Sequence, residues 1–99
     1  MKPTALASLL ALALLPPVAN TQTVQLPADV VRFVERRNLC DHFRGEEPYD
    51  AERRAFLEKR MREYCKGTDA QLASLKRKYK GRADLIARLS EYEAKVEVQ

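Results

Sequence analysis

The chain has 99 residues, with 18 Lys+Arg, 14 Asp+Glu and a single His, and a formal net charge of +4 at pH 7. This length supports one small domain with a modest core, and the mildly basic charge suits anionic envelope material or an acidic partner but by itself predicts neither. One histidine leaves most hydrolase mechanisms without a general base.

The first 19 residues have the three parts of a secretory signal peptide. Lys2 provides the positive end, residues 5–15 form an apolar run, and Ala19 offers a small residue for cleavage. As a helix this run would be about 16 Å long, whereas the hydrocarbon core of a membrane is about 30 Å thick. We therefore expect a periplasmic or secreted protein without a transmembrane segment in its mature chain. A retained membrane anchor is the alternative.

A helical domain is predicted over residues 27–96, after a flexible polar lead over residues 20–26. Pro27 suits the first position of a helix, and an apolar stripe predicts that this helix runs to about Arg37. The stripe consists of Val30, Val31, Phe33 and Val34. Residues 38–49 show no clear period, and Gly45 and Pro48 prevent an unkinked continuation.

Three further helices follow. Asp50 is a favourable N-cap for the second helix, which ends at Gly67, and Thr68 with Gln71 forms a capping box for the third, which ends at Gly81. The fourth begins near residue 82 or 83 and places Leu85, Ile86, Leu89, Tyr92 and Val96 on one face. Residues 97–99 are expected to fray. The predicted fold class is all-α, a small bundle of three to four short helices.

Cys40 and Cys65 are expected to form one disulfide, because exported proteins meet an oxidising environment. In the chain-entropy model this bond contributes about 3 to 4 kcal/mol. A disulfide needs Cα atoms within about 7 Å, yet Cys65 lies about 22 Å along the second helix from Asp50. We therefore predict that the first helix ends near Leu39 or Cys40, and that residues 41–49 run back along the second helix.

The densest polar cluster contains the ligand types of a divalent metal site: Cys40, Asp41, His42, Glu46, Glu47 and Asp50. Its spacing matches no known site, and a disulfide would consume the thiol, so a hydrogen-bonded loop is the favoured interpretation. Asp41, His42 and Glu46 are weak metal candidates. A Cys–His nucleophile pair would lack an oxyanion site. We predict no catalytic residue and no cofactor, and expect a protein that is not an enzyme.

A cationic cluster of Lys76, Arg77, Lys78, Lys80 and Arg82 stands near the end of the third helix. It suits the phosphates of an envelope polyanion, such as lipopolysaccharide or a cell-wall polymer, with Tyr79 packing on a sugar. The alternative is that cations gather where the helix dipole is negative and that Tyr79 belongs to the core. Export argues against nucleic acid as a routine partner.

The segments Cys-Asp-His-Phe-Arg-Gly-Glu-Glu-Pro-Tyr-Asp (residues 40–50) and Cys-Lys-Gly-Thr-Asp (residues 65–69) resemble a group of short exported proteins of Gram-negative bacteria. The resemblance covers most of residues 30–92. It implies export and a paired-cysteine domain, and it carries over no activity and no functional residue. The general plan is also similar to small single-disulfide periplasmic chaperones of acid stress, but fold alone does not determine function.

Three functional hypotheses follow from these observations. The preferred one is a non-enzymatic periplasmic interaction domain with a protein partner. The alternative is binding of an envelope polyanion through residues 76–82. A weaker one is an acid-stress chaperone, because protonation of 14 carboxylates leaves a strongly positive chain that loosens at low pH.

Overall fold

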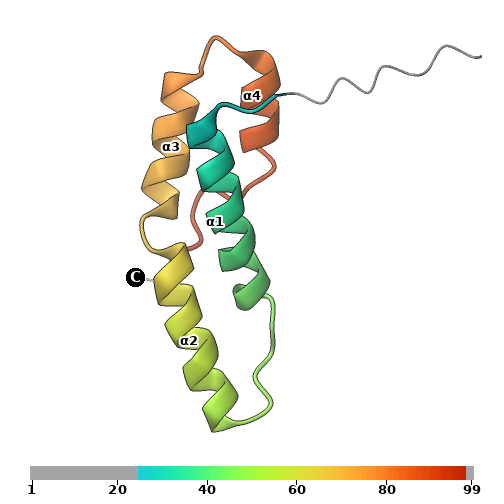
Figure 1. Ribbon diagram of the computed structural model, residues 1–99, viewed down its shortest axis with the longest axis vertical. Coiled ribbons are helices and arrows are strands. Elements are labelled where there is room, and N and C mark those ends of the chain that lie inside the picture. The colour runs from blue at the N-terminus through green and yellow to red at the C-terminus, as the bar shows by residue number, and fades with distance from the viewer. Residues whose placement is uncertain (1–24, 98–99) are drawn as a thin grey trace, which may run out of the picture.

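The computed structural model describes residues 25–97, which contain four helices. They are α1 (Ala28–Arg44), α2 (Ala51–Cys65), α3 (Thr68–Lys78) and α4 (Ala83–Leu89). α2 and α3 follow one another along one side of α1, and α4 lies at the end of the bundle where α1 begins (Figure 1). The predicted all-α class and the single disulfide are confirmed. The predicted signal peptide (1–19) and most of the predicted lead lie outside the described residues.

α1 is longer than predicted, because it continues through Cys40 to Arg44. The helix closes where the backbone N–H of Gly45 donates to the carbonyl of Asp41 at 3.0 Å. The prediction of a helix end near Leu39 or Cys40 is therefore wrong. The helix nevertheless ends before Gly45, as the sequence predicts, although Gly45 keeps a right-handed conformation with a φ of -82°.

The last turn of α1 is stabilised by aromatic packing against α2. The ring of Phe43 is stacked on Tyr64 and lies edge-on to Phe56, with centroid distances of 5.9 and 6.1 Å. Such contacts stabilise a helical turn beyond what its local sequence suggests. The polar residues around Phe43 lack a helical period, so only the partners on α2 reveal why this turn is helical.

The connection between α1 and α2 is extended and continues past the end of α1 before the chain reverses at Asp50 (Figure 1). Asp50 caps α2, since its carboxylate accepts a hydrogen bond from the Arg53 N–H at 2.7 Å. The 15 residues of α2 then carry the chain back to α1, where the Cα atoms of Cys40 and Cys65 lie 4.9 Å apart. An extended connection therefore does bring Cys65 close enough to Cys40 for a disulfide, as predicted, but this connection begins at Gly45 and not at residue 41.

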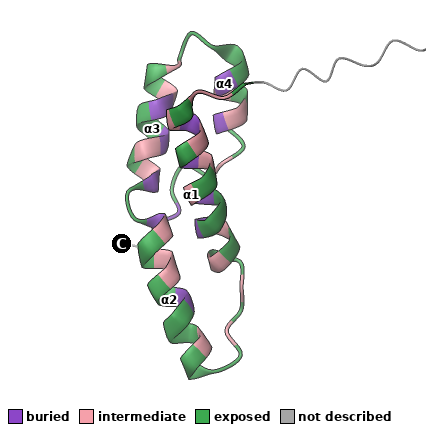
Figure 2. Ribbon diagram, in the orientation of Figure 1, coloured by how far each residue is buried: buried purple, intermediate pink, exposed green. Residues whose placement is uncertain are grey.

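Figure 2 marks the buried positions along the helices. Two clusters of these buried side chains stabilise the bundle. The first joins α1, α3 and α4 through Val30, Phe33, Leu72, Leu75 and Leu89. The second surrounds the disulfide, where Val96 is buried with Cys40 and Cys65, and Met61 and Tyr64 pack against them. Leu26, which belongs to the predicted flexible lead, packs against the first cluster.

α4 ends at Leu89, so the predicted apolar face that continues to Tyr92 and Val96 is not one helix face. After α4 the chain turns back toward the middle of the molecule, and Val96 reaches the disulfide cluster. Glu97 is also held, because its carboxylate accepts a hydrogen bond from the backbone N–H of Asp69 at 2.9 Å. Of the tail expected to fray, Glu97 thus forms a defined contact, and residues 98–99 lie outside the described range.

Candidate functional site

The predicted cationic cluster at the end of α3 is partly neutralised within the molecule. Lys78 pairs with the Asp29 carboxylate at 2.6 Å, and the Tyr79 hydroxyl donates to the same carboxylate at 2.8 Å. Arg82 pairs with Asp84 at 2.9 Å. Tyr79 is half-buried against the core, which agrees with the structural interpretation of this residue.

The contacts to Asp29 tie the start of α1 to the end of α3. The hydrogen bonds from Lys78 and then from Tyr79 hold the pKa of Asp29 below its ordinary value, and the pKa of Lys78 is raised by the same contact. The charges of Asp29 and Lys78 therefore stabilise the bundle, and a ligand that binds Lys78 would first have to break this contact.

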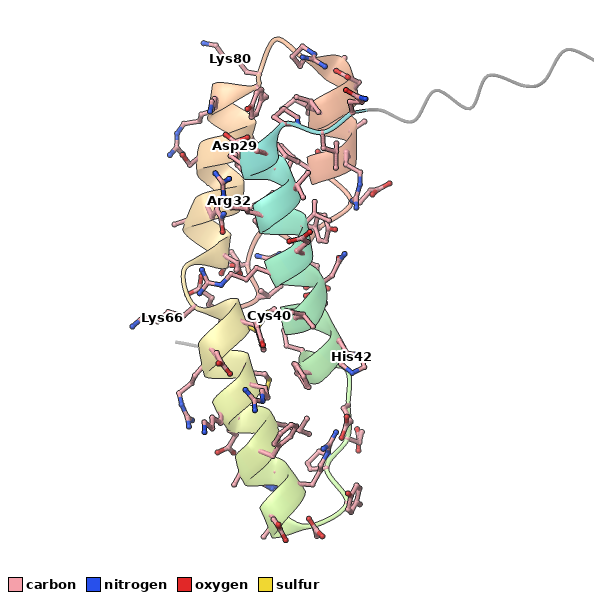
Figure 3. The ribbon with its side chains drawn as sticks, viewed as in Figure 1. Asp29, Arg32, Cys40, His42, Lys66 and Lys80 are labelled. Carbon is pink, nitrogen blue, oxygen red and sulfur yellow. A yellow bond between two sulfur atoms is a disulfide. The ribbon has the colours of Figure 1, made fainter. Side chains whose placement is uncertain are left out.

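Three members of the cationic cluster form no ion pair with another residue of the described range. They are Lys76, Arg77 and Lys80. Lys80 points away from the ribbon into solvent at one end of the molecule (Figure 3). The structure therefore reduces the predicted anion site from five cations to three.

The predicted metal candidates are not gathered into one site. Cys40 is in the disulfide, and Asp41 pairs with Arg44 at 3.0 Å. Glu46 forms a two-pronged ion pair with Arg53, whose hydrogen bonds lower the pKa of the Glu46 carboxyl. His42 is exposed and lies edge-on to the ring of Phe43. Within residues 25–97 no group of three or more His, Cys, Asp or Glu side chains is arranged to hold a metal ion.

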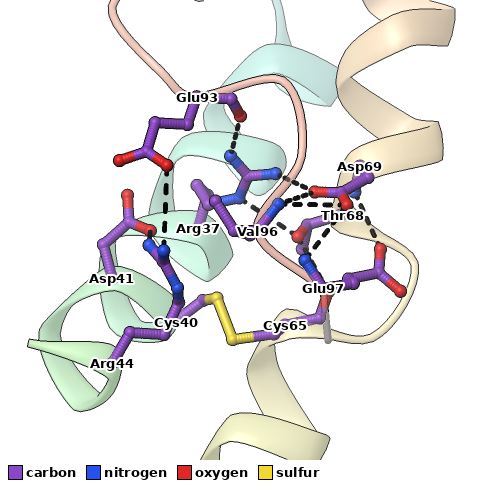
Figure 4. Close-up of polar contacts among 10 residues, drawn as sticks. All are labelled: Arg37, Cys40, Asp41, Arg44, Cys65, Thr68, Asp69, Glu93, Val96 and Glu97. Atoms are coloured by element: carbon purple, nitrogen blue, oxygen red, sulfur yellow. Dashed lines mark hydrogen bonds and ion pairs between the residues drawn. A yellow bond between two sulfur atoms is a disulfide. The ribbon is translucent and has the colours of Figure 1, made fainter. Parts of the chain in front are cut away.

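Arg37 is the buried polar centre that the sequence analysis missed. Its side chain is 0 % exposed, and all three of its nitrogens donate. Nε donates to the Thr68 hydroxyl at 3.1 Å, Nη1 to the Glu93 carbonyl at 2.7 Å, and Nη2 to Asp69 Oδ1 at 2.7 Å. The guanidinium also lies over the Phe33 ring, 5.5 Å from its centroid. The arginine therefore links α1, α3 and the tail (Figure 4).

A sequence signal for Arg37 existed. Val30, Phe33, Arg37 and Cys40 recur at steps of three and four residues, so Arg37 stands in the apolar stripe of α1. A charged residue at such a position predicts a buried partner. The predicted helix end near Arg37 concealed this pattern.

Asp69 anchors the tail that follows α4. Its carboxylate accepts hydrogen bonds from the backbone N–H groups of Val96, at 2.9 and 3.1 Å, and of Glu97, at 3.1 Å. The capping box predicted at Thr68 is absent, since Gly67 is the N-cap residue and the Thr68 hydroxyl instead donates to the Cys65 carbonyl at 2.8 Å. The start of α3 therefore fixes the tail beside the disulfide.

A groove of about 820 Å³ is formed where this tail meets α2. Met61, Cys65 and Val96 provide apolar lining, and the disulfide cluster lies behind them. Lys59, Arg62 and Lys66 stand around it. The groove thus combines an apolar surface with cations, a surface that no sequence motif indicated.

The charges around the groove are unevenly satisfied. Glu63 pairs with Arg60, Arg44 with Asp41, and Glu97 accepts from a backbone N–H. In contrast, Lys59, Arg62 and Lys66 form no side-chain hydrogen bond or ion pair with any residue of the described part. Lys59 and Arg62 lie three residues apart on one side of α2, and Lys66 follows the end of that helix. Glu58 is the groove's acid without such a contact in this range. The unsatisfied charge of the groove is therefore net positive.

Comparison with protein-family models, curated proteins and solved structures finds no match to this chain. Among residues 25–97, no helix combines the length and the apolar character needed to cross a membrane.

Proposed function

We propose that this protein is a non-enzymatic binding domain that acts in the periplasm after removal of residues 1–19, and that the groove between α2 and the tail is its binding site. The observation that carries the proposal is the groove itself, whose volume of about 820 Å³ lies within the range of ligand sites. We also propose that the chain belongs with the short exported proteins of Gram-negative bacteria that residues 40–50 and 65–69 resemble.

Rigid support of the groove favours this function. The disulfide joins α1 to the last turn of α2 behind the groove, and Asp69 holds the Val96 backbone from the other side. A site whose walls are held by covalent and buried polar contacts loses little freedom when a ligand binds. This arrangement gives a reason for placing Arg37 and Asp69, which are costly to bury, at this level of the bundle.

The site is tested by photo-crosslinking in the native compartment. A photoreactive benzoylphenylalanine replaces Glu58 in the groove or, as a control, the exposed Ala87 of α4. We expect an adduct at position 58 that excess unlabelled wild-type protein suppresses, and no such adduct at position 87. Equal adducts at both positions, or an adduct that the competitor leaves unchanged, would contradict the proposal.

Export is tested by the intact mass of the non-reduced protein from that compartment. A mass corresponding to residues 20–99 less two protons is expected, from cleavage after Ala19 and closure of the disulfide. A mass that retains residues 1–19 would show that the chain is not processed there.

Binding of an envelope polyanion at the end of α3 is the second candidate function. It is supported by Lys76, Arg77 and Lys80, which form no ion pair with another described residue. Replacing all three with Gln should abolish a salt-sensitive association with lipopolysaccharide or cell-wall polymer, because the anionic groups of such polymers attract cations in a salt-dependent way. Unchanged retention on the polymer would rule this candidate out.

A further inference from the structure

We infer that the groove binds a single-chain anionic amphiphile, taken up as a monomer, with its alkyl chain on the apolar surface and its anionic headgroup among Lys59 and Arg62 of α2 and Lys66, which follows α2. This inference rests on the proposed function, because it assigns a ligand class to the same groove. It uses two independent properties of the groove, its apolar lining and its unsatisfied charge.

The apolar lining suits an alkyl chain. Met61 is half-buried and Val96 and Cys65 are 7 % exposed, so Met61 provides most of the apolar side-chain surface that a ligand can reach, and the edges of Val96 and Cys65 continue it. Met is flexible and polarisable, and adapts to an irregular apolar ligand. Removing the chain of such a ligand from water supplies binding energy in proportion to its buried area.

The charge pattern favours an anionic headgroup. Lys59, Arg62 and Lys66 have no described carboxylate partner, whereas two of the groove's acids, Glu63 and Glu97, are engaged within the protein. Lys66 points away from the ribbon into solvent (Figure 3). A phosphate or carboxylate headgroup would therefore gain charge-assisted hydrogen bonds without first breaking internal ion pairs.

An amphiphile fits both properties better than the other classes of ligand. A small anion would use the cations and leave the apolar lining exposed to water. A neutral lipid would use the lining and leave three charges without partners. The groove is thus complementary to one molecule that carries both an alkyl chain and an anionic headgroup.

The inference is tested with alkyl phosphates below their critical micelle concentration, and binding is followed by amide chemical shifts and calorimetry. Dodecyl phosphate should bind with one-to-one stoichiometry and shift the amides of residues 58–66 and 96–97. Affinity should rise from octyl to dodecyl phosphate by up to about fourfold per added methylene while the chain still gains contacts. Inorganic phosphate, and a neutral dodecyl glucoside, should each bind at least about tenfold more weakly.

Two matched variants separate a specific site from general attraction between charges. The groove variant carries Lys59→Gln, Arg62→Gln and Lys66→Gln, and the control carries Lys76→Gln, Arg77→Gln and Lys80→Gln. Both lose three positive charges from exposed or half-buried positions, so both should fold. The groove variant should bind dodecyl phosphate about tenfold more weakly or worse, and the control should bind like wild type.

Several outcomes would overturn the inference. These are equal weakening in the two variants, equal affinity for inorganic phosphate or for the neutral glucoside, and association with anionic vesicles only. Groove shifts that depend on protein concentration without any probe would instead assign the groove to a second copy of this chain. If no alkyl phosphate binds while the crosslink at position 58 persists, this inference fails and the proposed binding function stands. If the crosslink fails as well, both are wrong.

Discussion

Arg37 is a full charge in the interior, and its environment explains how the bundle tolerates it. Every nitrogen of the guanidinium donates a hydrogen bond, and the carboxylate of Asp69 balances the charge at 2.7 Å. Burial of an ion pair contributes little net stability by itself, but removal of one partner leaves an uncompensated charge. The pair therefore acts mainly by specifying where α3 and the tail must lie.

Replacing Asp69 tests this assignment. We expect Asp69→Asn to lower the free energy of unfolding by about 2 to 4 kcal/mol, less than for a fully buried pair because the Asp69 side chain is 22 % exposed. The urea midpoint should fall, and the backbone amides of Val96 and Glu97 should lose protection from hydrogen exchange. Asp84→Asn, which breaks the exposed pair with Arg82, is the matched control and should leave both measurements nearly unchanged. Equal effects of the two substitutions would contradict the role of Asp69.

Asp29 makes part of the stability dependent on pH in a defined direction. Hydrogen bonds from Lys78 and Tyr79 hold the pKa of its carboxyl below the ordinary value of 3.8. A carboxyl whose pKa is lower in the folded state stabilises that state above the unfolded pKa, and this stabilisation disappears as pH falls through the folded pKa.

The corresponding experiment compares urea unfolding of wild type and Asp29→Asn between about pH 2.5 and 6. The variant should be less stable at pH 6, and its free energy of unfolding should fall less steeply below about pH 4. Glu47→Gln is the control, because Glu47 is exposed and forms no ion pair with a described residue. If the free energy of unfolding of Asp29→Asn fell with decreasing pH as steeply as that of wild type, the contact of Asp29 would not be linked to folding.

At the scale of the elements, the junction between α2 and α3 is made by one glycine. Gly67 has a φ of 82°, in the left-handed region, and thereby lets α3 follow α2 with only two residues between them. A Cβ at this position would meet no atom within 4 Å, so a substitution would be opposed by the backbone conformation alone. Residues other than glycine rarely adopt this conformation.

Gly67→Ala should therefore lower the free energy of unfolding by about 1 to 2 kcal/mol. Gly81 provides the comparison, because a Cβ there also meets nothing within 4 Å and its φ is not positive. Gly81→Ala should be neutral or slightly stabilising, since alanine restricts the unfolded chain. The two variants are compared by urea denaturation, and a similar destabilisation of both would disprove the backbone explanation.

Elements could be predicted where their evidence is local. The Asp50 cap, the stop at Gly45 and the start of α4 all depend on residues within one turn of the boundary, and the structure has each of them. The last turn of α1 and the short α4 were predicted incorrectly because their lengths depend on packing partners from other elements. Phe43 illustrates this, since its stabilising neighbours belong to α2.

At the scale of the whole molecule, the disulfide joins α1 to the last residue of α2. It closes a loop with a sequence separation of 25 and forms the centre of the second buried cluster. Its loss should lower the free energy of unfolding by about 3 to 4 kcal/mol. It should also loosen Val96, and with it one wall of the groove.

The double substitution Cys40→Ala and Cys65→Ala tests both effects. Urea denaturation gives the stability, and hydrogen exchange of the Val96 amide gives the local opening. If the double variant folds, its affinity for dodecyl phosphate should fall. The affinity of the control variant with Lys76→Gln, Arg77→Gln and Lys80→Gln should fall less. Wild-type stability and exchange in the double variant would show that the helices hold the groove without the bond.

The sequence by itself determined the helical class, the disulfide and the Asp50 cap of α2, because these follow from residue counts and from neighbours along the chain. Only the tertiary structure decided the role of Arg37, the path of the tail and the presence of the groove. Each of these depends on contacts between residues 27 to 56 positions apart, such as Asp69 with Val96 and Arg37 with Glu93. No local pattern encodes such distances, since they arise only when the helices pack.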